Sequence, residues 1–338
     1  MRIGSNPQIE KPLQSSEYFH QVIMPVYIPN NEGYFKDSFN VLRISIDSLL
    51  KTVHPKTFIS IVNNGSSPEI IAYLDDLYQN NKIHELIHTN NIGKVNAINK
   101  AFVGQSFPLV TITDADVLFL NNWQKAVYDI CDAFPKAGAV CTTPNSRALK
   151  QLTENIFFDC FFSKSLRFTN VKDSQAMLDF VDSIGNPWEL RPIHKQKCLT
   201  VNHKETSAMV GAGHYVCTYN RHALPEEGFG KTTDLMGKKL MYNVDVAVVK
   251  KGYWRLSTVD NFTYHMGNSS EKWMYEKLQN TIQEKNEIEL PRLKKLKSAP
   301  LLNGFKITVF GALLFSRHLF WKNFLRYKGL KKGEAKYY

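Results

Sequence analysis

The chain has 338 residues, of which 43 % are hydrophobic and 22 % are charged; this composition excludes a disordered protein and fits one or two folded α/β domains. Residues 291–338 hold twelve basic residues and one acidic residue, Glu334, and so account for the whole net charge of +11. The rest of the chain is neutral, which argues against nucleic acid as a partner of the folded body.

Apolar and amphipathic stretches alternate through the first 134 residues. The patterns predict strands at 20–29, 57–67, 83–90 and 108–117, and helices at 38–53, 68–81, 93–102 and 121–134. This alternation predicts a parallel sheet with helices on both faces. After residue 145 the pattern weakens, and 271–297 again has the spacing of a helix, with a break at Pro291.

Three polar clusters follow predicted strands, at 63–66, 91–94 and 114–116. Ligands of parallel sheets bind at the carboxyl ends of the strands, so these clusters predict one shared site. Asp114 and Asp116 are one residue apart in "TITDADVLFL". In an extended segment both side chains point to the same side, where they can share Mg²⁺ or Mn²⁺ while the cation keeps positions for phosphate oxygens.

Two enzyme classes place Asp-x-Asp after a buried strand. Haloacid-dehalogenase-like phosphatases have D-x-D-x-[T/V] and use the first Asp as a phosphoryl-accepting nucleophile. Residues 114–117, "DADV", fit the first four positions of this pattern, and Leu118 stands at the fifth. Nucleotide-sugar transferases use the motif to hold a metal on the donor diphosphate. The phosphatase motif is expected near the N-terminus, whereas here it follows three predicted strands, so the phosphatase is the more remote alternative.

Six segments occur in the order "VIMPVYIPN", "IVNNGSSPE", "NNIGKVNAINKAF", "TDADV", "LPEEGFGKTTDLMGKKLMYNVDVAVVKKGY" and "YHMGN". Together they resemble the motifs of family 2 glycosyltransferases with the GT-A fold, over residues 20–270. The resemblance implies a GT-A domain at 18–270. Its nucleotide-sugar-binding half, 18–145, would be Rossmann-like with a mostly parallel sheet, and its acceptor half would be 146–270. Residues 271–338 would form a basic, aromatic, helical tail.

The resemblance also implies site residues. Asp116 and His265 would bind Mn²⁺ or Mg²⁺. The implied donor-binding residues are Pro25, Tyr27, Asn63, Gly93, Lys94, Asp114, Ala115 and Gly211. Asn63 stands where the family often has Asp; its amide oxygen can still accept a hydrogen bond from uracil, so a UDP-sugar is favoured and other donors stay open.

Asp234 matches the last acid of the family's catalytic motif, with Glu226 and Glu227 in reserve. Such a base takes the proton of an acceptor hydroxyl as that oxygen attacks the anomeric carbon, and the single displacement inverts this carbon. Residues 232–234 also suit a helix N-cap, which is the structural alternative for this segment.

The expected function is therefore transfer of a sugar from a nucleoside diphosphate sugar to a hydroxyl of a glycan or lipid-linked glycan. A GT-A protein that binds nucleotide or glycan without catalysis remains the alternative, because Asn63 and Thr233 replace acidic residues of the family.

The tail contains "ITVFGALLFS", 307–316, whereas a membrane-spanning helix needs roughly 20 apolar residues. Its aromatic and basic residues are typical of a segment at an anionic membrane surface, and packing of the tail on the body is the alternative. The scattered cysteines and the absence of an apolar leader are typical of a cytoplasmic protein. We therefore expect a cytoplasmic protein, peripheral at the inner face of the cytoplasmic membrane.

Overall fold

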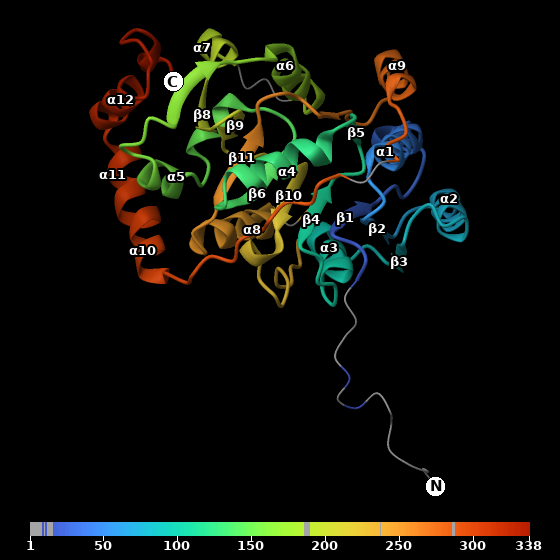
Figure 1. Cartoon of the computed structure of the whole chain (residues 1–338). Coiled ribbons are helices and arrows are strands. Elements are labelled where there is room, and N and C mark those ends of the chain that lie inside the picture. Colours follow the sequence, from blue (N-terminus) through green and yellow to red (C-terminus); the bar gives the residue numbers. More distant parts are fainter. Residues whose placement is uncertain (1–8, 10, 12–15, 186–189, 237, 286–287) are drawn as a thin grey trace.

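The computed structural model describes residues 9, 11 and 16–338, apart from 186–189, 237 and 286–287. Its centre is a ten-stranded sheet with the order β3-β2-β1-β4-β10-β6-β11-β9-β8-β7. These strands are β1 (His20–Val26), β2 (Thr57–Asn64), β3 (Glu85–Thr89), β4 (Leu109–Thr113), β6 (Ala137–Cys141), β7 (Leu166–Asn170), β8 (Lys197–His203), β9 (Thr206–Val210), β10 (Val216–Asn220) and β11 (Trp254–Thr258). Helices flank the sheet (Figure 1).

The helices of the body follow the strands in alternation as far as α4. They are α1 (Ser38–Thr52), α2 (Pro68–Gln79), α3 (Lys94–Phe102), α4 (Trp123–Ala133), α5 (Glu154–Asp159), α6 (Ser174–Ser183), α7 (Pro192–Gln196), α8 (Lys238–Lys250) and α9 (Lys272–Asn280), with the short turns η1 (Gly33–Phe35), η2 (Ser146–Lys150) and η3 (Arg221–Ala223). The eight elements predicted before residue 134 are confirmed, with ends that differ by a few residues.

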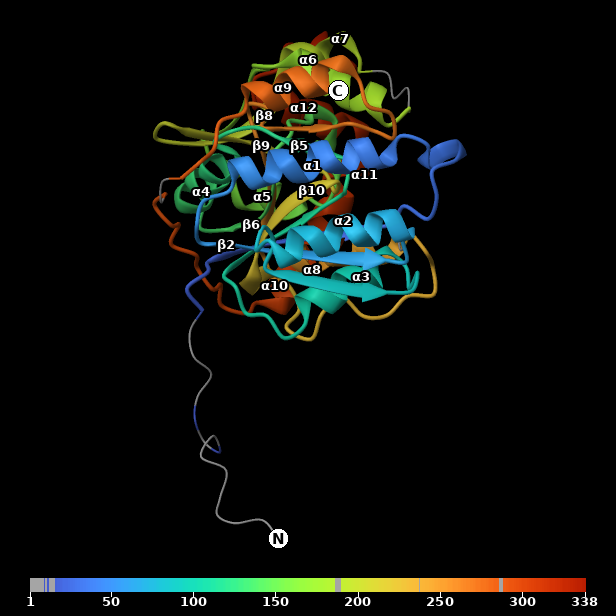
Figure 2. The ribbon, with the colours of Figure 1, turned by 90° about the vertical axis from the view of Figure 1, so that its right-hand side faces the viewer.

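The first four strands are parallel, in the order β3-β2-β1-β4. Helices α1 and α2 lie on one face of these strands and α3 on the other (Figure 2). The strand order reverses between β1 and β4, and the crevice at such a switch point is where ligands bind in this architecture. The parallel sheet predicted for the first half is confirmed, whereas β10, β9, β8 and β7 add antiparallel pairs and make the complete sheet mixed.

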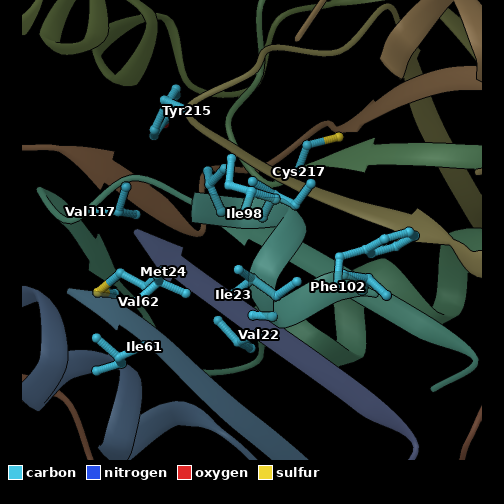
Figure 3. Packing of buried hydrophobic residues seen from close by; sticks show 14 of the residues in the cluster. Val22, Ile23, Met24, Ile61, Val62, Ile98, Phe102, Val117, Tyr215 and Cys217 are labelled. Atoms are coloured by element: carbon cyan, nitrogen blue, oxygen red, sulfur yellow. The ribbon is translucent and has the colours of Figure 1, made fainter. Parts of the chain in front are cut away.

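Buried aliphatic side chains hold α3 against the parallel strands. Ile23 of β1, Val62 of β2 and Ile98 of α3 are fully buried in one cluster. Figure 3 shows these side chains facing each other between α3 and the strands. Burial of each is worth about 1.5–3 kcal/mol, so these contacts stabilise the packing of α3 on β1 and β2.

The strand predicted at 108–117 is divided in two. β4 ends at Thr113, and β5 (Val117–Phe119) leaves the main sheet to pair with β12 (Thr263–His265). Residues 114–116 form the connection between the two strands. The aspartates therefore lie in a turn at the carboxyl end of β4.

The helix predicted at 271–297 is wrong beyond Asn280, where α9 ends. The following described residues are not helical because their backbone bonds to the body instead. Asn121 bonds both the N–H and the C=O of Ile282, and Glu284 N donates to Lys51 O. These contacts use the backbone groups that a helix would need internally.

The tail packs on the body through α10 (Pro300–Phe305), the π-helical η4 (Lys306–Phe310), α11 (Gly311–Ser316) and α12 (His318–Tyr327), with η5 (Glu334–Lys336) beyond them. Trp321 is buried against Phe157 of α5, with ring centroids 5.7 Å apart. Lys306 Nζ lies 2.5 Å from Asp159 Oδ1, while Lys136 bonds the other oxygen of this carboxylate. Among the described helices, none is both long and apolar enough to cross a membrane.

Candidate active site

The Asp-x-Asp turn is anchored by two backbone hydrogen bonds. Asp114 N donates to Tyr215 O at 2.8 Å, and Met266 N donates to Asp116 O at the same distance. These partners come from segments about 100 and 150 residues further along the chain. The turn is therefore fixed at the place where the parallel strands meet β10 and β12.

His265 reaches Asp116 because β12 pairs with β5. His265 lies opposite Val117 in this register, and its Nε2 is 3.4 Å from Asp116 Oδ2. Its Nδ1 lies 3.0 Å from Ser183 Oγ, and this contact orients the ring with Nε2 toward Asp116. The two residues predicted as metal ligands are thus brought together.

The Asp116 carboxylate has the chemistry of a cation ligand. Its Oδ1 is buried and has no hydrogen-bond partner in the described part of the chain. Burial raises the pKa of Asp116, and His265 only partly offsets this effect. The residues therefore fit Mg²⁺ or Mn²⁺, which is often held by one or two carboxylates together with substrate phosphates. No group of three His, Cys, Asp or Glu side chains with metal-binding geometry occurs within the described ranges.

A cation from α3 meets the first aspartate. The Lys94 ammonium pairs with Asp114 Oδ1, and Lys94 N donates to Leu235 O at 2.8 Å. Gly93 precedes it with φ +87°, and a Cβ there would lie 3.0 Å from Asp234 O. The start of α3, Asp114 and the segment around Asp234 therefore lie together.

The predicted nucleotide-base residues lie at the ends of β1 and β2. Asn63 is buried; its Oδ1 accepts a hydrogen bond from Ser66 N, and its Nδ2 lies 2.9 Å from His88 Nδ1. Tyr27 is 41 % exposed, with its ring edge-to-face with Phe35. Contact of Pro25, Tyr27 and Asn63 with a base stays a prediction.

The predicted base Asp234 is exposed, and its N–H donates to Thr232 Oγ1 at 3.0 Å. Gly211 has φ +103°, and a Cβ there would lie 2.5 Å from Ala148 O. Glycine at 211 is thus required by a close approach of two backbones. The sugar contact predicted for Gly211 and the proton transfer predicted for Asp234 stay predictions.

A cavity of about 730 Å³ opens beside the aspartates. Its lining residues include Asp114, His265, His214, Asp245 and Arg255. Sequence reasoning missed Asp245 and Arg255. Their signal is a charged residue within an apolar run, "NVDVAVV" in α8 and "WRLS" in β11.

These two residues form a buried ion pair. Arg255 Nη2 donates to Asp245 Oδ2 at 2.9 Å, and their side chains are 1 % and 0 % exposed. Tyr219 OH donates to Asp245 Oδ1 at 3.2 Å, and His214 Nδ1 lies 2.8 Å from Oδ2. The carboxylate is thus neutralised and held on three sides.

The first half of the chain is similar to known proteins. Residues 21–171, which contain the first four strands and the Asp-x-Asp turn, match the model described as Glycosyl transferase family 2. The poly-beta-1,6-N-acetyl-D-glucosamine synthase of Staphylococcus epidermidis is 23 % identical over 150 residues, 43 % of this chain and 35 % of that protein. The chain thus matches about a third of the length of this relative.

Two solved structures are similar at low identity. The mannosyltransferase PcManGT from Pyrobaculum calidifontis, in complex with GDP-Man and Mn²⁺, is 16 % identical with a TM-score of 0.43, covering 97 % of this chain and 77 % of that one. TarS 1-349 of S. aureus, in complex with UDP, is 14 % identical with a TM-score of 0.40, covering 77 % and 63 %. Of the two classes weighed for Asp-x-Asp, the match over residues 21–171 favours the transferases. Residues 21–171, just under half of the chain, are thus similar to glycosyl transferase family 2, a family of glycosyltransferases.

Proposed function

We propose that the protein is a metal-dependent, inverting glycosyltransferase that moves a sugar from a nucleoside diphosphate sugar to a hydroxyl of a glycan or lipid-linked glycan. One observation carries the proposal. The buried Oδ1 of Asp116 lacks a partner in the described chain and lies beside His265, at the end of β4. A divalent cation on a diphosphate would supply that partner.

Each donor group has a candidate partner in this proposal. Asp116 and His265 hold Mn²⁺ or Mg²⁺, which when bound neutralises the departing diphosphate. Lys94 lies beside Asp114 and adds a positive charge at the same place. Gly93 precedes α3 beside the Asp114–Lys94 pair and would lie near the phosphates, and Asn63 lies at the end of β2 for the base. Because its amide can accept from uracil N3–H, a UDP-sugar is the first donor to test.

The acceptor enters from the cavity, with 18–145 as the donor half and 146–270 as the acceptor half. A base must take the proton of its hydroxyl. The family resemblance assigns the role of this base to Asp234. The rate of sugar transfer by Asp234→Asn tests the assignment.

Donor turnover tests the proposal directly. UDP-N-acetylglucosamine, UDP-glucose and GDP-mannose are each incubated with the protein and Mn²⁺, and release of nucleoside diphosphate is measured with water as the acceptor. We expect turnover of one donor, lost in EDTA and in Asp116→Asn. Binding of nucleotide without turnover of any donor would instead support the non-catalytic alternative.

The tail supports peripheral membrane binding as a part of the same function. Large apolar side chains on α10 to α12 face solvent although the opposite sides of these helices are buried. They are Leu301, Leu302, Phe305, Val309, Leu313, Leu319, Phe320 and Tyr327. Arg317 and Arg326 are exposed among them. Phe162, 84 % exposed, extends the surface, because Phe161 beside it stacks on Phe320.

An exposed apolar surface with basic residues fits the interface of an anionic membrane. Association with the inner face of the cytoplasmic membrane would place the cavity near a lipid-linked acceptor. All five cysteines are free and buried, which is typical of a protein in a reducing compartment.

Sedimentation with phosphatidylglycerol vesicles tests this association. We expect binding that Leu301→Asp with Leu319→Asp weakens at least tenfold. The control Ile282→Asp changes an exposed apolar residue outside the tail and should leave binding unchanged. Equal binding of all three proteins would refute the role of the tail.

A further inference from the structure

His214 is placed to meet an acceptor hydroxyl. It precedes β10, lines the cavity that Asp114 and His265 also line, and has a side chain 48 % exposed. Its neighbour Tyr215 holds the Asp-x-Asp turn through the Tyr215 O to Asp114 N hydrogen bond. The imidazole therefore lies in the same cavity as Asp114, on a segment that is hydrogen-bonded to the Asp-x-Asp turn.

Asp245 holds His214 by one ring nitrogen. The 2.8 Å contact between Nδ1 and the carboxylate favours the tautomer that carries its proton on Nδ1, so the lone pair is on Nε2. Arg255 and Tyr219 donate hydrogen bonds to the Asp245 carboxylate and hold it in place. This is the arrangement of a base oriented by a buried third group.

The backbone of the cavity is strained near this pair. Leu152, which also lines the cavity, has φ +56°, a left-handed conformation that is costly for a residue with a Cβ. Such strain persists where the surrounding structure holds a functional geometry. Asp234, in contrast, is exposed, with its carbonyl against Gly93, and it is not among the described residues that line the cavity.

We propose that His214 is the catalytic base of the transfer and that Asp245 is its positioning residue, in place of Asp234. This inference rests on the proposed glycosyltransferase function. Nε2 of His214 takes the proton of the acceptor hydroxyl while the hydroxyl oxygen forms its bond to the anomeric carbon. The bond from that carbon to the diphosphate oxygen breaks, and its electron pair leaves with the nucleoside diphosphate. The imidazolium then loses the proton to water.

The test uses the full chain with Mn²⁺ and the donor that the wild type hydrolyses fastest, with water as the acceptor. We compare His214→Ala, Asp245→Asn, Asp234→Asn and the control His203→Ala, which removes an exposed histidine of β8. For every variant the turnover rate, the UDP affinity in Mn²⁺ and the melting temperature are measured, and turnover is repeated with added imidazole.

We expect His214→Ala to lower kcat about 100-fold, as for loss of a general base, while its UDP affinity stays within twofold of the wild type. Imidazole should restore part of its turnover and should not restore Asp245→Asn, whose kcat falls with an unchanged UDP affinity. The control His203→Ala should turn over within threefold of the wild type, and Asp234→Asn should lose less turnover than His214→Ala.

Turnover of His214→Ala near the wild-type rate, with loss in Asp234→Asn, would overturn the inference and return the base to Asp234. A wild type that binds UDP with Mn²⁺ but hydrolyses no donor would also overturn it. A wild type without metal-dependent UDP binding would instead refute the proposed function as a whole.

Discussion

Arg255→Met should cost about 3–5 kcal/mol of the free energy of unfolding. The side chain is 1 % exposed and its guanidinium makes three hydrogen bonds, to Asp245 Oδ2, Ala212 O and Gln151 O, at 2.7–2.9 Å. Methionine fills a similar volume but leaves the buried Asp245 carboxylate without its countercharge, and removal of one partner of a buried ion pair typically costs this amount. His214 and Tyr219 still reach Asp245, which favours the lower end of the range.

Urea unfolding of the single and double variants measures this cost. Asp245→Asn in the Arg255→Met background removes the uncompensated charge, so the double variant should recover about 2 kcal/mol of the loss. The two losses should therefore be far from additive, as expected for residues in contact. A loss below about 1 kcal/mol for Arg255→Met, or additive losses, would refute a buried, mutually dependent pair.

Three further outcomes follow from the packing, each measured by urea unfolding. Trp321→Ala should cost about 3–5 kcal/mol of the free energy of unfolding, because the indole is buried in the core. The control Leu319→Ala, at a side chain that is 74 % exposed, should change it by less than about 0.5 kcal/mol. Equal effects of the two substitutions would contradict packing of the tail on the body. Burial alone raises the pKa of Asp159, but hydrogen bonds from two lysines and an indole outweigh it and lower this pKa below 3.8. The ionised carboxylate of Asp159 therefore stabilises the fold at neutral pH, and Asp159→Asn should cost about 2 kcal/mol of the free energy of unfolding at pH 7. This cost should shrink as the pH falls through the lowered pKa of the folded protein. A cost that does not change with pH down to 2 would contradict the ion pair. Gly211→Ala should cost about 1–3 kcal/mol, because its Cβ would collide with Ala148 O at a φ of +103°, and an unchanged stability would contradict this backbone approach.

The parallel half of the fold and the position of Asp114 and Asp116 could be predicted from the sequence. β1, β2 and β4 are short apolar segments that alternate with amphipathic helices. The spacing of apolar residues indicates such elements from neighbouring residues alone, without knowledge of tertiary contacts. The turn after β4 follows from the same signal. Asp114 and Asp116 could therefore be predicted at the sheet edge without knowledge of their partners.

The other features of the site depend on contacts between residues that are far apart in the sequence. β5 and β12 have three residues each and no pattern of their own, so the approach of His265 to Asp116 came only from the family resemblance. Asp245 and Arg255 meet across α8 and β11, and each alone reads as an interruption of an apolar run. The predicted helix beyond Asn280 failed because side chains of the body, such as Asn121, bind its backbone. Tertiary contacts of this kind override local helix propensity.

Calorimetric titration of UDP in Mn²⁺ and in EDTA, for the wild type and Asp116→Asn, tests metal-dependent donor binding at the Asp-x-Asp turn. We expect Mn²⁺ to tighten UDP binding to the wild type at least tenfold, because Asp116 and His265 would hold the cation that meets the diphosphate. Asp116→Asn should remove the metal effect and leave the metal-free affinity unchanged. If the wild type binds UDP, and every other nucleoside diphosphate tested, equally tightly in Mn²⁺ and in EDTA, this result would contradict a donor site at the Asp-x-Asp turn.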